Sequence, residues 1–354
     1  MMKVDEKILS GIIERIGKRP LVLYGAGKYG RQALENIRKY FPHLMVKYFI
    51  DDNRVRNSGD IQGIEIKSLE EVLRELGKDF CILITNYYVP EVLEKIERNH
   101  FDLSNVFFSS GIMIEDINPL YLNQNLRNLQ KAYTMLDDYK SKMIFREMVE
   151  ARFTKKIDVL SRTCESIQYF PGQEVFCVGD DEVFVDAGAF DGDTIKQFQE
   201  ITGGKFKYIY AFEPDSMNCQ KLREHKYNGN VSLYQAGLYD RTGTVCFSGN
   251  QGGSSKIEVG GGEEVDVYRF DELDLPEKGI TFVKMDIEGS ERKALEGMRQ
   301  AIREHKPKLA ICMYHKFEDL WELPLYIKEL VPEYKLYIRN YTTYLDEVVL
   351  YATI

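Results

Sequence analysis

Short apolar runs alternate with charged stretches of helical periodicity between residues 18 and 111. The runs LVLYG, VKYFIDD and CILITN are rich in aromatic and β-branched residues, and KYGRQALENIRKY and SLEEVLRELG lie between them. Runs of the first kind are typical of strands, whereas apolar positions spaced by three or four residues are typical of helices. The pattern predicts a βαβαβ order and a first domain at residues 1–115.

The pattern changes to a predicted hairpin near residue 171, and a second alternation of the same kind begins at Glu182. Strands are predicted at EVFVDAG, KYIYAFEP, VSLYQAGLY, TFVKMDI and KLAICMYH. A hairpin is predicted in EVFCVGDDEVFVDAG, because Gly179, Asp180 and Asp181 favour a turn between two apolar runs. The tail from residue 333 onwards contains two further apolar runs, which predict an antiparallel edge on a mostly parallel sheet.

The residues between the two alternations have a helical composition. Glycine is missing from 118 to 168, and Leu, Met, Lys and Glu are frequent there. We therefore expect an α/β protein with two doubly wound Rossmann-like domains, a helical linker at residues 116–170 and a second domain at residues 171–354.

Composition narrows the classes of partner. The chain of 354 residues has a formal net charge of -9, so it lacks the basic footprint with which proteins bind nucleic acid. Its six cysteines form no CxxC pair, which favours reduced thiols over a disulfide framework or a zinc site. Because no apolar run has the length of a membrane span or the pattern of a secretory signal, we expect a cytoplasmic protein without a membrane span.

The first glycine loop has the form GxGxxG, between a predicted strand and a predicted helix. Gly25, Gly27 and Gly30 supply the glycines, and Asp51 ends the next strand. The loop resembles that of the nucleotide-binding domain that precedes some sugar-modifying enzymes, which implies a nucleotide sugar or a dinucleotide as ligand. The alternative is a docking or dimerisation module without a ligand, and one GxGxxG motif does not separate the two.

The second glycine loop, VDAGAFDGDT, has different chemistry. Its glycines are Gly188 and Gly192, but Asp186 and Asp191 would repel a pyrophosphate at close range. A cationic ligand without phosphate suits it, and S-adenosyl-L-methionine carries a sulfonium, an ammonium and a carboxylate for the helix N-terminus. Glu213 ends the next strand, where a carboxylate can accept hydrogen bonds from both ribose hydroxyls. For Asp186 and Glu213, binding is favoured over helix capping because both end apolar strands.

Four ordered motifs, VDAGAFDGDT, AFEPD, AGLYDRTG and FVKMDIEGSERKALEG, resemble the FkbM family of S-adenosylmethionine-dependent methyltransferases, from about residue 183 to the C-terminus. The resemblance implies a class I methyltransferase fold and O-methylation as the usual reaction. It also implies a cofactor pocket that contains Asp186, Gly188, Gly192 and Glu213, and we add the neighbouring Asp191 to the expected cofactor-binding residues. By position, Asp240 would approach the adenine amino group, although it is equally suited to begin a turn. Asp286 would lie between the cofactor and the substrate.

Transfer of a methyl group to a hydroxyl needs alignment of the two groups and a base for the hydroxyl proton. His315 ends the run KLAICMYH and is expected to face the same crevice as Asp286. We interpret both as catalytic residues, with His315 as the general base; the alternative is that His315 holds a loop through a neighbouring carboxylate. The close spacing of Asp286 and Glu288 is weak support for a divalent metal, and we expect none.

The sequence thus predicts a methyltransferase that acts on a hydroxyl of a sugar, a glycan precursor or nucleotide sugar, or another small metabolite, in a chain that is compatible with a homodimer. The main alternative is an NAD(P)-dependent dehydrogenase or epimerase that acts on a nucleotide sugar through the first glycine loop. A third interpretation is a noncatalytic nucleotide-sensing scaffold.

The Gly- and Ser-rich segment GNQGGSSKIEVGGGEE is expected to be a lid over the substrate or a plain surface loop.

Overall fold

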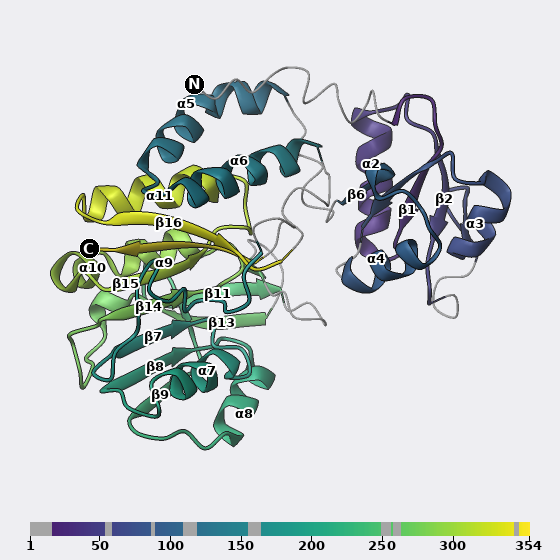
Figure 1. The fold of residues 1–354 in the computed structure, drawn as a ribbon. Helices are drawn as coiled ribbons and strands as arrows, with labels where there is room; N and C mark the ends of the chain where they lie inside the picture. Colours follow the sequence, from purple (N-terminus) through teal and green to yellow (C-terminus); the bar gives the residue numbers. More distant parts are fainter. Residues whose placement is uncertain are drawn as a thin grey trace. The chain divides into compact units, whose positions relative to one another are not determined.

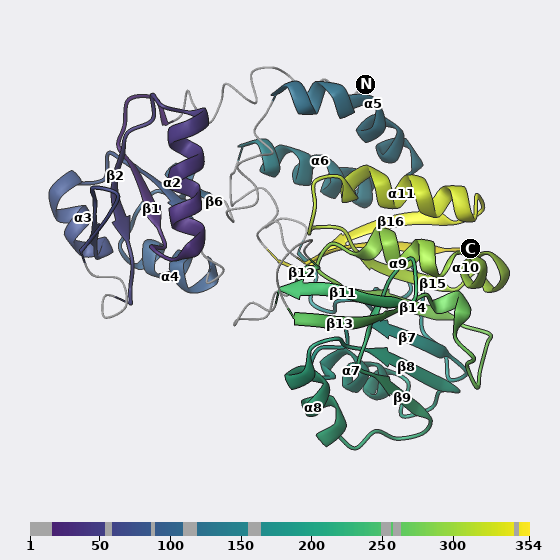
Figure 2. The ribbon, with the colours of Figure 1, turned by 180° about the vertical axis from the view of Figure 1, so that it is seen from behind.

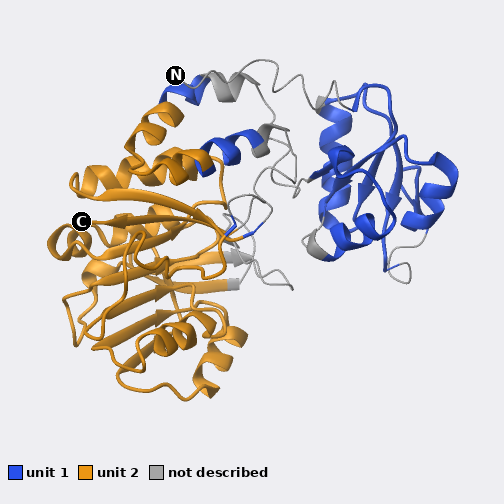
Figure 3. Cartoon of the chain, viewed as in Figure 1, with its two compact units in different colours: residues 1–127, 144–164, 342–345 blue, residues 128–143, 165–341, 346–354 orange. Residues whose placement is uncertain are grey.

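The computed structural model describes residues 16–53, 59–85, 89–108, 119–154, 164–248, 256–257, 263–342 and 347–354. The chain forms two compact units (Figure 3). The first unit contains residues 1–127, 144–164 and 342–345, and the second contains residues 128–143, 165–341 and 346–354. Each unit is built around its own sheet.

The first unit contains a six-stranded sheet in the order β3-β4-β2-β1-β5-β6. The strands are β1 (Leu21–Tyr24), β2 (Val46–Ile50), β3 (Asp60–Ile61), β4 (Ile64–Lys67), β5 (Cys81–Ile84) and β6 (Val106–Phe108). The helices are α2 (Lys28–Tyr40), α3 (Leu69–Leu76), α4 (Val89–Arg98) and the short 3-10 turn η1 (Leu103–Asn105). The pairings between strands are parallel except that of β3 with β4, so the order follows the predicted alternation with one added hairpin.

Successive residues of β1 point to opposite faces of this sheet, as the pleat of a strand requires. Leu21 and Leu23 belong to the same buried cluster as Leu34 of α2. Val22 and Tyr24 belong to a second cluster that includes residues of α3 and α4. The sheet is therefore covered on both faces, which explains why its central strands are continuous apolar runs.

The second unit contains a seven-stranded sheet in the order β16-β17-β15-β14-β7-β8-β9. The strands are β7 (Val183–Ala187), β8 (Tyr208–Phe212), β9 (Val231–Tyr234), β14 (Phe282–Met285), β15 (Lys308–Cys312), β16 (Lys335–Asn340) and β17 (Val348–Thr353). The first five are parallel, and β17 is antiparallel to both β15 and β16. A smaller sheet has the order β10-β13-β11-β12, with β10 (Gly237–Leu238), β11 (Gly243–Ser248), β12 (Lys256–Ile257) and β13 (Glu263–Tyr268).

The helices of the second unit lie on both faces of its large sheet (Figures 1 and 2). They are α7 (Asp193–Ile201), α8 (Ser216–Glu224), α9 (Glu291–Gly297), α10 (Arg299–His305) and α11 (Asp319–Leu330), with the 3-10 turn η4 (Phe270–Glu272). The strand order runs outward from β7 in two directions, so right-handed crossovers place α7 and α8 on one face and α9 and α10 on the other. The carboxyl ends of β7 and β14 therefore border a topological switch point, where open α/β sheets bind ligands.

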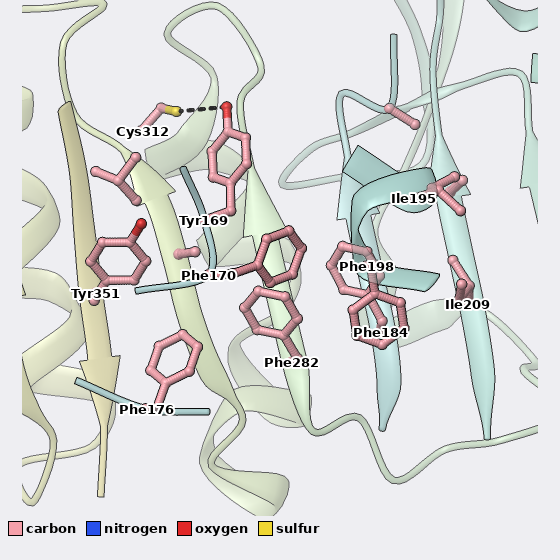
Figure 4. Close-up of a cluster of buried hydrophobic side chains, with 14 of the residues drawn as sticks. Tyr169, Phe170, Phe176, Phe184, Ile195, Phe198, Ile209, Phe282, Cys312 and Tyr351 are labelled. Atoms are coloured by element: carbon pink, nitrogen blue, oxygen red, sulfur yellow. Dashed lines mark hydrogen bonds between the residues drawn. The ribbon is translucent and has the colours of Figure 1, made fainter. Parts of the chain in front are cut away.

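Aromatic side chains fill the core beneath α7 (Figure 4). The rings of Phe184 and Phe282, on neighbouring strands, stack with centroids 4.8 Å apart, and Phe198 of α7 packs 4.7 Å from Phe184. The segment before β7 contributes Tyr169 and Phe176 to the same cluster. This segment therefore acts as core rather than as a connection on the surface.

That packing corrects the predicted hairpin. Gly172 and Phe176 form only an isolated bridge, and residues 177–182 pair with no strand in the described part of the chain. The Phe176 ring instead contacts Phe282 and Tyr351, at centroid distances of 5.7 Å each. A second difference concerns VSLYQAGLY, which divides into β9 and β10 in two different sheets.

Two helices precede the second alternation of strands, α5 (Pro119–Met135) and α6 (Tyr139–Thr154). Asp138, which precedes α6, and Ser141 in its first turn bind the buried Arg339 of β16: Arg339 Nη2 lies 2.8 Å from Asp138 Oδ2, and Nη1 lies 3.2 Å from Ser141 Oγ. Arg339 Nε also lies 3.1 Å from Glu165 Oε1. One guanidinium thus attaches the start of α6 to the edge of the sheet.

Two further expectations concern the chain as a whole. None of the six cysteines forms a disulfide bond in the structure. Over the residues that are described, no helix combines the length and apolarity that a bilayer span requires. Residues 249–255 and 258–262, which make up most of the expected lid segment, lie outside the described residues.

Candidate active site

A cleft of about 150 Å³ opens at the carboxyl ends of β7, β8 and β14. Three of the residues expected to bind or react line it, namely Gly188, Glu213 and Asp286. The other lining residues are Phe190, Pro214, Asn218, Gly237, Leu238, Val265, Val267, Ile287, Glu288 and Ser290. The cleft therefore combines three carboxylates with an apolar wall from the small sheet.

Gly188 lets two loops meet at the floor of the cleft. Its φ is +77°, and a Cβ atom there would lie 1.9 Å from the backbone oxygen of Asp286. A side chain at Gly188 would therefore push the loop after β7 away from the end of β14. The Gly188 carbonyl accepts a hydrogen bond from Lys284 Nζ at 2.6 Å, which fixes the loop from below.

Asp186 lies beneath the cleft rather than in its lining. Its carboxylate is fully buried, and its Oδ1 lies 3.0 Å from the equally buried Lys284 Nζ. Burial raises the pKa of Asp186 to about 6, although the Lys284 ammonium partly opposes this shift. The observed contact of Asp186 is thus with the ammonium that supports Gly188.

Glu213 joins two loops of the cleft through its carboxylate. Oε2 accepts a hydrogen bond from the Phe190 N–H, and Oε1 accepts one from the Asp215 N–H, each at 2.9 Å. Burial raises the pKa of this carboxyl above its usual value. A carboxylate oxygen can accept two hydrogen bonds, and each oxygen of Glu213 accepts one of those described above. Glu213 can therefore accept further hydrogen bonds from a ligand.

Asp286 is held at the cleft wall by two phenols. Tyr169 donates a hydrogen bond to Oδ2 at 2.7 Å, and Tyr314 donates one to Oδ1 at 3.1 Å. Burial alone would raise the pKa of Asp286, but the charges of His315 and Lys284 hold it well below its usual range. The carboxylate is therefore ionised and fixed in orientation.

His315 lies behind Asp286 and is enclosed by carboxylates. Nε2 lies 3.3 Å from Asp286 Oδ1 and 3.8 Å from Glu288 Oε2, and Nδ1 lies 2.9 Å from Glu291 Oε1. Burial alone would lower the pKa of His315, but the charges of Glu291 and Asp286 hold it well above its usual range. Without a further ligand, this arrangement favours an imidazolium that holds the carboxylates over the free base expected from the sequence.

The remaining expected cofactor ligands do not line the cleft as described. Asp240 pairs with Lys293 at 2.8 Å and with Arg241 at 3.3 Å. Gly192 is the N-cap of α7, and the half-buried Asp191 precedes it. Their contacts with a cofactor stay predictions.

In the first glycine loop, a backbone N–H is already hydrogen-bonded to the side chain of Asp51. Asp51 Oδ2 accepts the Ala26 N–H at 2.8 Å, so this carboxylate engages a donor that a phosphate would otherwise use. Gly30 is required for close packing, because a Cβ atom there would lie 1.8 Å from the Gly25 oxygen. By contrast, a Cβ atom at Gly27 would meet nothing within 4 Å. Nucleotide binding by this loop stays a prediction.

Sequence reasoning missed four side chains of the site: Lys284, Glu291, Tyr169 and Tyr314. Lys284 had a usable signal, because a lysine within the apolar run TFVKMDI needs a buried partner. The two tyrosines had none, since 23 tyrosines are scattered along the chain.

Fold and cleft together define the second unit as a Rossmann-like α/β domain whose ligand cleft lies at the carboxyl ends of its parallel strands. Residues 186–343 match the methyltransferase FkbM domain, so this part of the chain is similar to that family. The resemblance inferred from the four sequence motifs is confirmed.

Comparison with solved structures extends beyond this domain. The crystal structure of methyltransferase FkbM from Methylobacillus flagellatus is 25% identical, with a TM-score of 0.71 over 99% of this chain and 94% of that chain. A precorrin-6y C5,15-methyltransferase from Geobacter metallireducens is 13% identical, with a TM-score of 0.32 over 50% of this chain and 82% of that chain. No curated protein matches the chain.

Proposed function

We propose that the second unit transfers a methyl group from S-adenosyl-L-methionine to a hydroxyl of a small acceptor such as a sugar, a glycan precursor or a nucleotide sugar. The observation that carries the proposal is the cleft in which Gly188, Glu213 and Asp286 meet, inside the residues that match the methyltransferase FkbM domain. When bound, the cofactor supplies an electrophilic methyl group on its sulfonium.

The residues of the cleft fit such a ligand. Glu213 keeps acceptor capacity for ribose hydroxyls after its two backbone hydrogen bonds. Phe190, Leu238 and Val267 supply apolar surface for the adenine ring of the cofactor. The site contains the acidic side chains that a sulfonium and an ammonium favour, and the charge of the buried Lys284 is balanced by Asp186.

Asp286 is the residue best placed to orient an acceptor hydroxyl. It lines the cleft, and Tyr169 and Tyr314 fix its carboxylate. An ionised carboxylate accepts a hydrogen bond from a hydroxyl and so aligns the oxygen for in-line attack. We assign His315 the role of holding Asp286 in place, and we keep the general-base role as the alternative that an activity assay decides.

Calorimetric titration with S-adenosylhomocysteine tests the cofactor site. We expect one site per chain in the wild type and a loss of affinity of roughly tenfold to a hundredfold in Glu213→Gln, the range for a hydrogen bond to a charged group. Glu224→Gln is the matched control, because Glu224 is an exposed carboxylate at the end of α8. Absence of binding in the wild type, or equal affinity in both variants, would reject the proposed site.

A methyl-transfer assay with a panel of hydroxylated acceptors then tests the reaction. Asp286→Asn is expected to abolish turnover while S-adenosylhomocysteine still binds, and His315→Gln tests the base. If His315→Gln retains cofactor binding and full turnover, His315 takes no part in the reaction. The dehydrogenase or epimerase alternative finds no support in the comparisons, and the acceptor, a homodimer and a ligand for the first unit stay predictions.

A further inference from the structure

Three side chains from different elements gather behind the cleft. Asp286 follows β14, Glu291 begins α9 and His315 follows β15, and one potential ligand atom from each lies within 4.8 Å of the others. Together they offer imidazole nitrogen and carboxylate oxygen. Divalent first-row cations accept this mixture, whereas Mg²⁺ and Ca²⁺ favour oxygen alone.

The imidazole supplies an independent observation. His315 is only 4% exposed, and its Nε2 forms no hydrogen bond of acceptable geometry with any described residue, although carboxylate oxygens lie 3.3 Å and 3.8 Å away. Glu291 is completely buried, and its Oε2 also makes no hydrogen bond within the described part of the chain. Buried polar atoms are normally satisfied, so this cluster requires an explanation.

The distances around Nε2 suit a shared cation better than direct hydrogen bonds. Nε2 lies 3.3 Å from Asp286 Oδ1 and 3.8 Å from Glu288 Oε2. Ligand bonds of about 2.1 Å place neighbouring ligand atoms roughly 3–3.5 Å apart. The separation from Asp286 lies in this range, and the separation from Glu288 is slightly longer. Asp286 and Glu288 both line the cleft, so two of the three donor residues border a space that is open to solvent.

Glu291 occupies the place of a supporting carboxylate. Its Oε1 lies 2.9 Å from Nδ1, the ring nitrogen that faces away from Asp286. Histidines that bind metals commonly direct their second nitrogen to such a carboxylate, which fixes the ring orientation. Glu291 is itself fixed, because Oε1 accepts the Ile287 N–H at 3.0 Å.

We propose that His315 Nε2, Asp286 and Glu288 form a binding site for one divalent first-row cation at the wall of the cleft, with Glu291 as the carboxylate that orients the imidazole. The residues thus form a carboxylate–histidine–metal arrangement with positions open to the cleft. Any part of the cation in methyl transfer rests on the proposed function, whereas its binding does not.

Mn²⁺ alone is the probe. The full chain, stripped with a chelator, is titrated with Mn²⁺ while electron paramagnetic resonance measures the free ion, and Zn²⁺ is then added as a competitor. We expect one saturable site per chain from which Zn²⁺ displaces Mn²⁺, because Zn²⁺ binds such donors more tightly. Absence of a saturable site in the wild type would overturn the proposal whatever the variants do.

Variants assign the ligands. We expect Glu288→Gln and Glu291→Gln each to lower the Mn²⁺ affinity by roughly tenfold to a hundredfold. Glu296→Gln is the matched control, because Glu296 lies on the same helix as Glu291 and pairs with Arg292 and Lys293 at the surface. Equal affinity in Glu288→Gln and Glu296→Gln would place the ion elsewhere and overturn the assignment.

Two controls keep the outcomes separate. Fluorescence of Trp321, the single tryptophan and a buried residue of α11, reports whether each variant folds. Glu288 is 27% exposed, so Glu288→Gln tests the site even if the buried Glu291→Gln variant does not fold. S-adenosylhomocysteine titration without metal tests the proposed function separately, since its failure leaves the Mn²⁺ result intact.

Discussion

Lys284 and Asp186 are register partners on the neighbouring strands β14 and β7, and Lys284 Nζ lies 3.0 Å from Asp186 Oδ1. The side chains are 3% and 0% exposed, respectively. The same ammonium donates to the Gly188 carbonyl at the floor of the cleft. A buried ion pair therefore supports the loop that forms the candidate cofactor site.

Removal of one partner of this pair is expected to destabilise the second unit. Lys284→Met leaves Asp186 as an unpaired buried carboxylate, which costs about 3–5 kcal/mol in the free energy of unfolding. Urea denaturation followed by Trp321 fluorescence measures the loss at pH 8. The double variant Asp186→Asn/Lys284→Met is the control, and we expect it to recover most of the loss; no recovery would contradict the assigned pairing.

The stability of the wild type is expected to depend on pH through Asp186. Its pKa is raised from 3.8 to about 6 in the folded chain, so the folded state binds this proton more tightly than the unfolded state. The resulting stabilisation is fully present below about pH 3.8 and is lost as the pH rises through about 6. Unfolding free energies of the wild type and Asp186→Asn, measured between these values, should diverge; parallel curves would contradict the shift.

Gly188→Ala should abolish S-adenosylhomocysteine binding. The change adds strain of about 1–2 kcal/mol at a left-handed residue, and it adds a clash with the Asp286 carbonyl. Gly203→Ala is the matched control, because Gly203 has a φ of +60° and open space around its Cβ position. We expect calorimetry to show unchanged affinity in the control; a normal affinity in Gly188→Ala would show that the loops need not meet.

Arg339→Lys should fail to replace the buried guanidinium. Arg339 uses Nε, Nη1 and Nη2 for three different partners, and a single ammonium cannot reach all of them. We expect a loss of about 3–5 kcal/mol in the unfolding of the second unit, the range for breaking a buried ion pair. Arg303→Lys, at an exposed position of α10, should change stability little by the same Trp321 measurement.

Gly30→Ala should weaken the first unit, whereas Gly27→Ala should not. The added methyl group meets the Gly25 carbonyl in the first case and open space in the second. Amide hydrogen exchange over residues 21–40, which include β1 and α2, measures the difference. Equal protection in the two variants would contradict the packing role of Gly30.

Much of the sheet framework could be predicted from the sequence. Strands such as β8 are apolar runs that end at an acidic residue, here Glu213, because parallel strands are buried on both faces and ligands are met at their carboxyl ends. The prediction of a hairpin at Gly179 was wrong because residues that favour a turn do not by themselves decide whether the flanking segments pair as strands. The Phe176 ring packs on Phe282 and Tyr351, and this tertiary contact places the segment in the core instead of in a second strand.

The site was predictable only where function coincides with a local motif. Gly188, Glu213 and Asp286 follow directly after strands, and the structure brings all three to one cleft. The partners that set their charge and orientation, such as Lys284 and Tyr169, come from other strands and loops far along the chain. The lysine within TFVKMDI indicates that a buried partner exists, but which residues make these contacts depends on tertiary packing, and no local pattern identifies them.

Asp286 belongs both to the cleft and to the carboxylate and imidazole cluster behind it. Two ligands that share a residue are thermodynamically linked. The factor by which one ligand changes the affinity for the other equals the factor by which the second changes the affinity for the first. Measuring S-adenosylhomocysteine affinity with and without Mn²⁺, and Mn²⁺ affinity with and without S-adenosylhomocysteine, therefore closes a cycle. The coupling free energy from that cycle reports directly how strongly this one carboxylate connects the two sites.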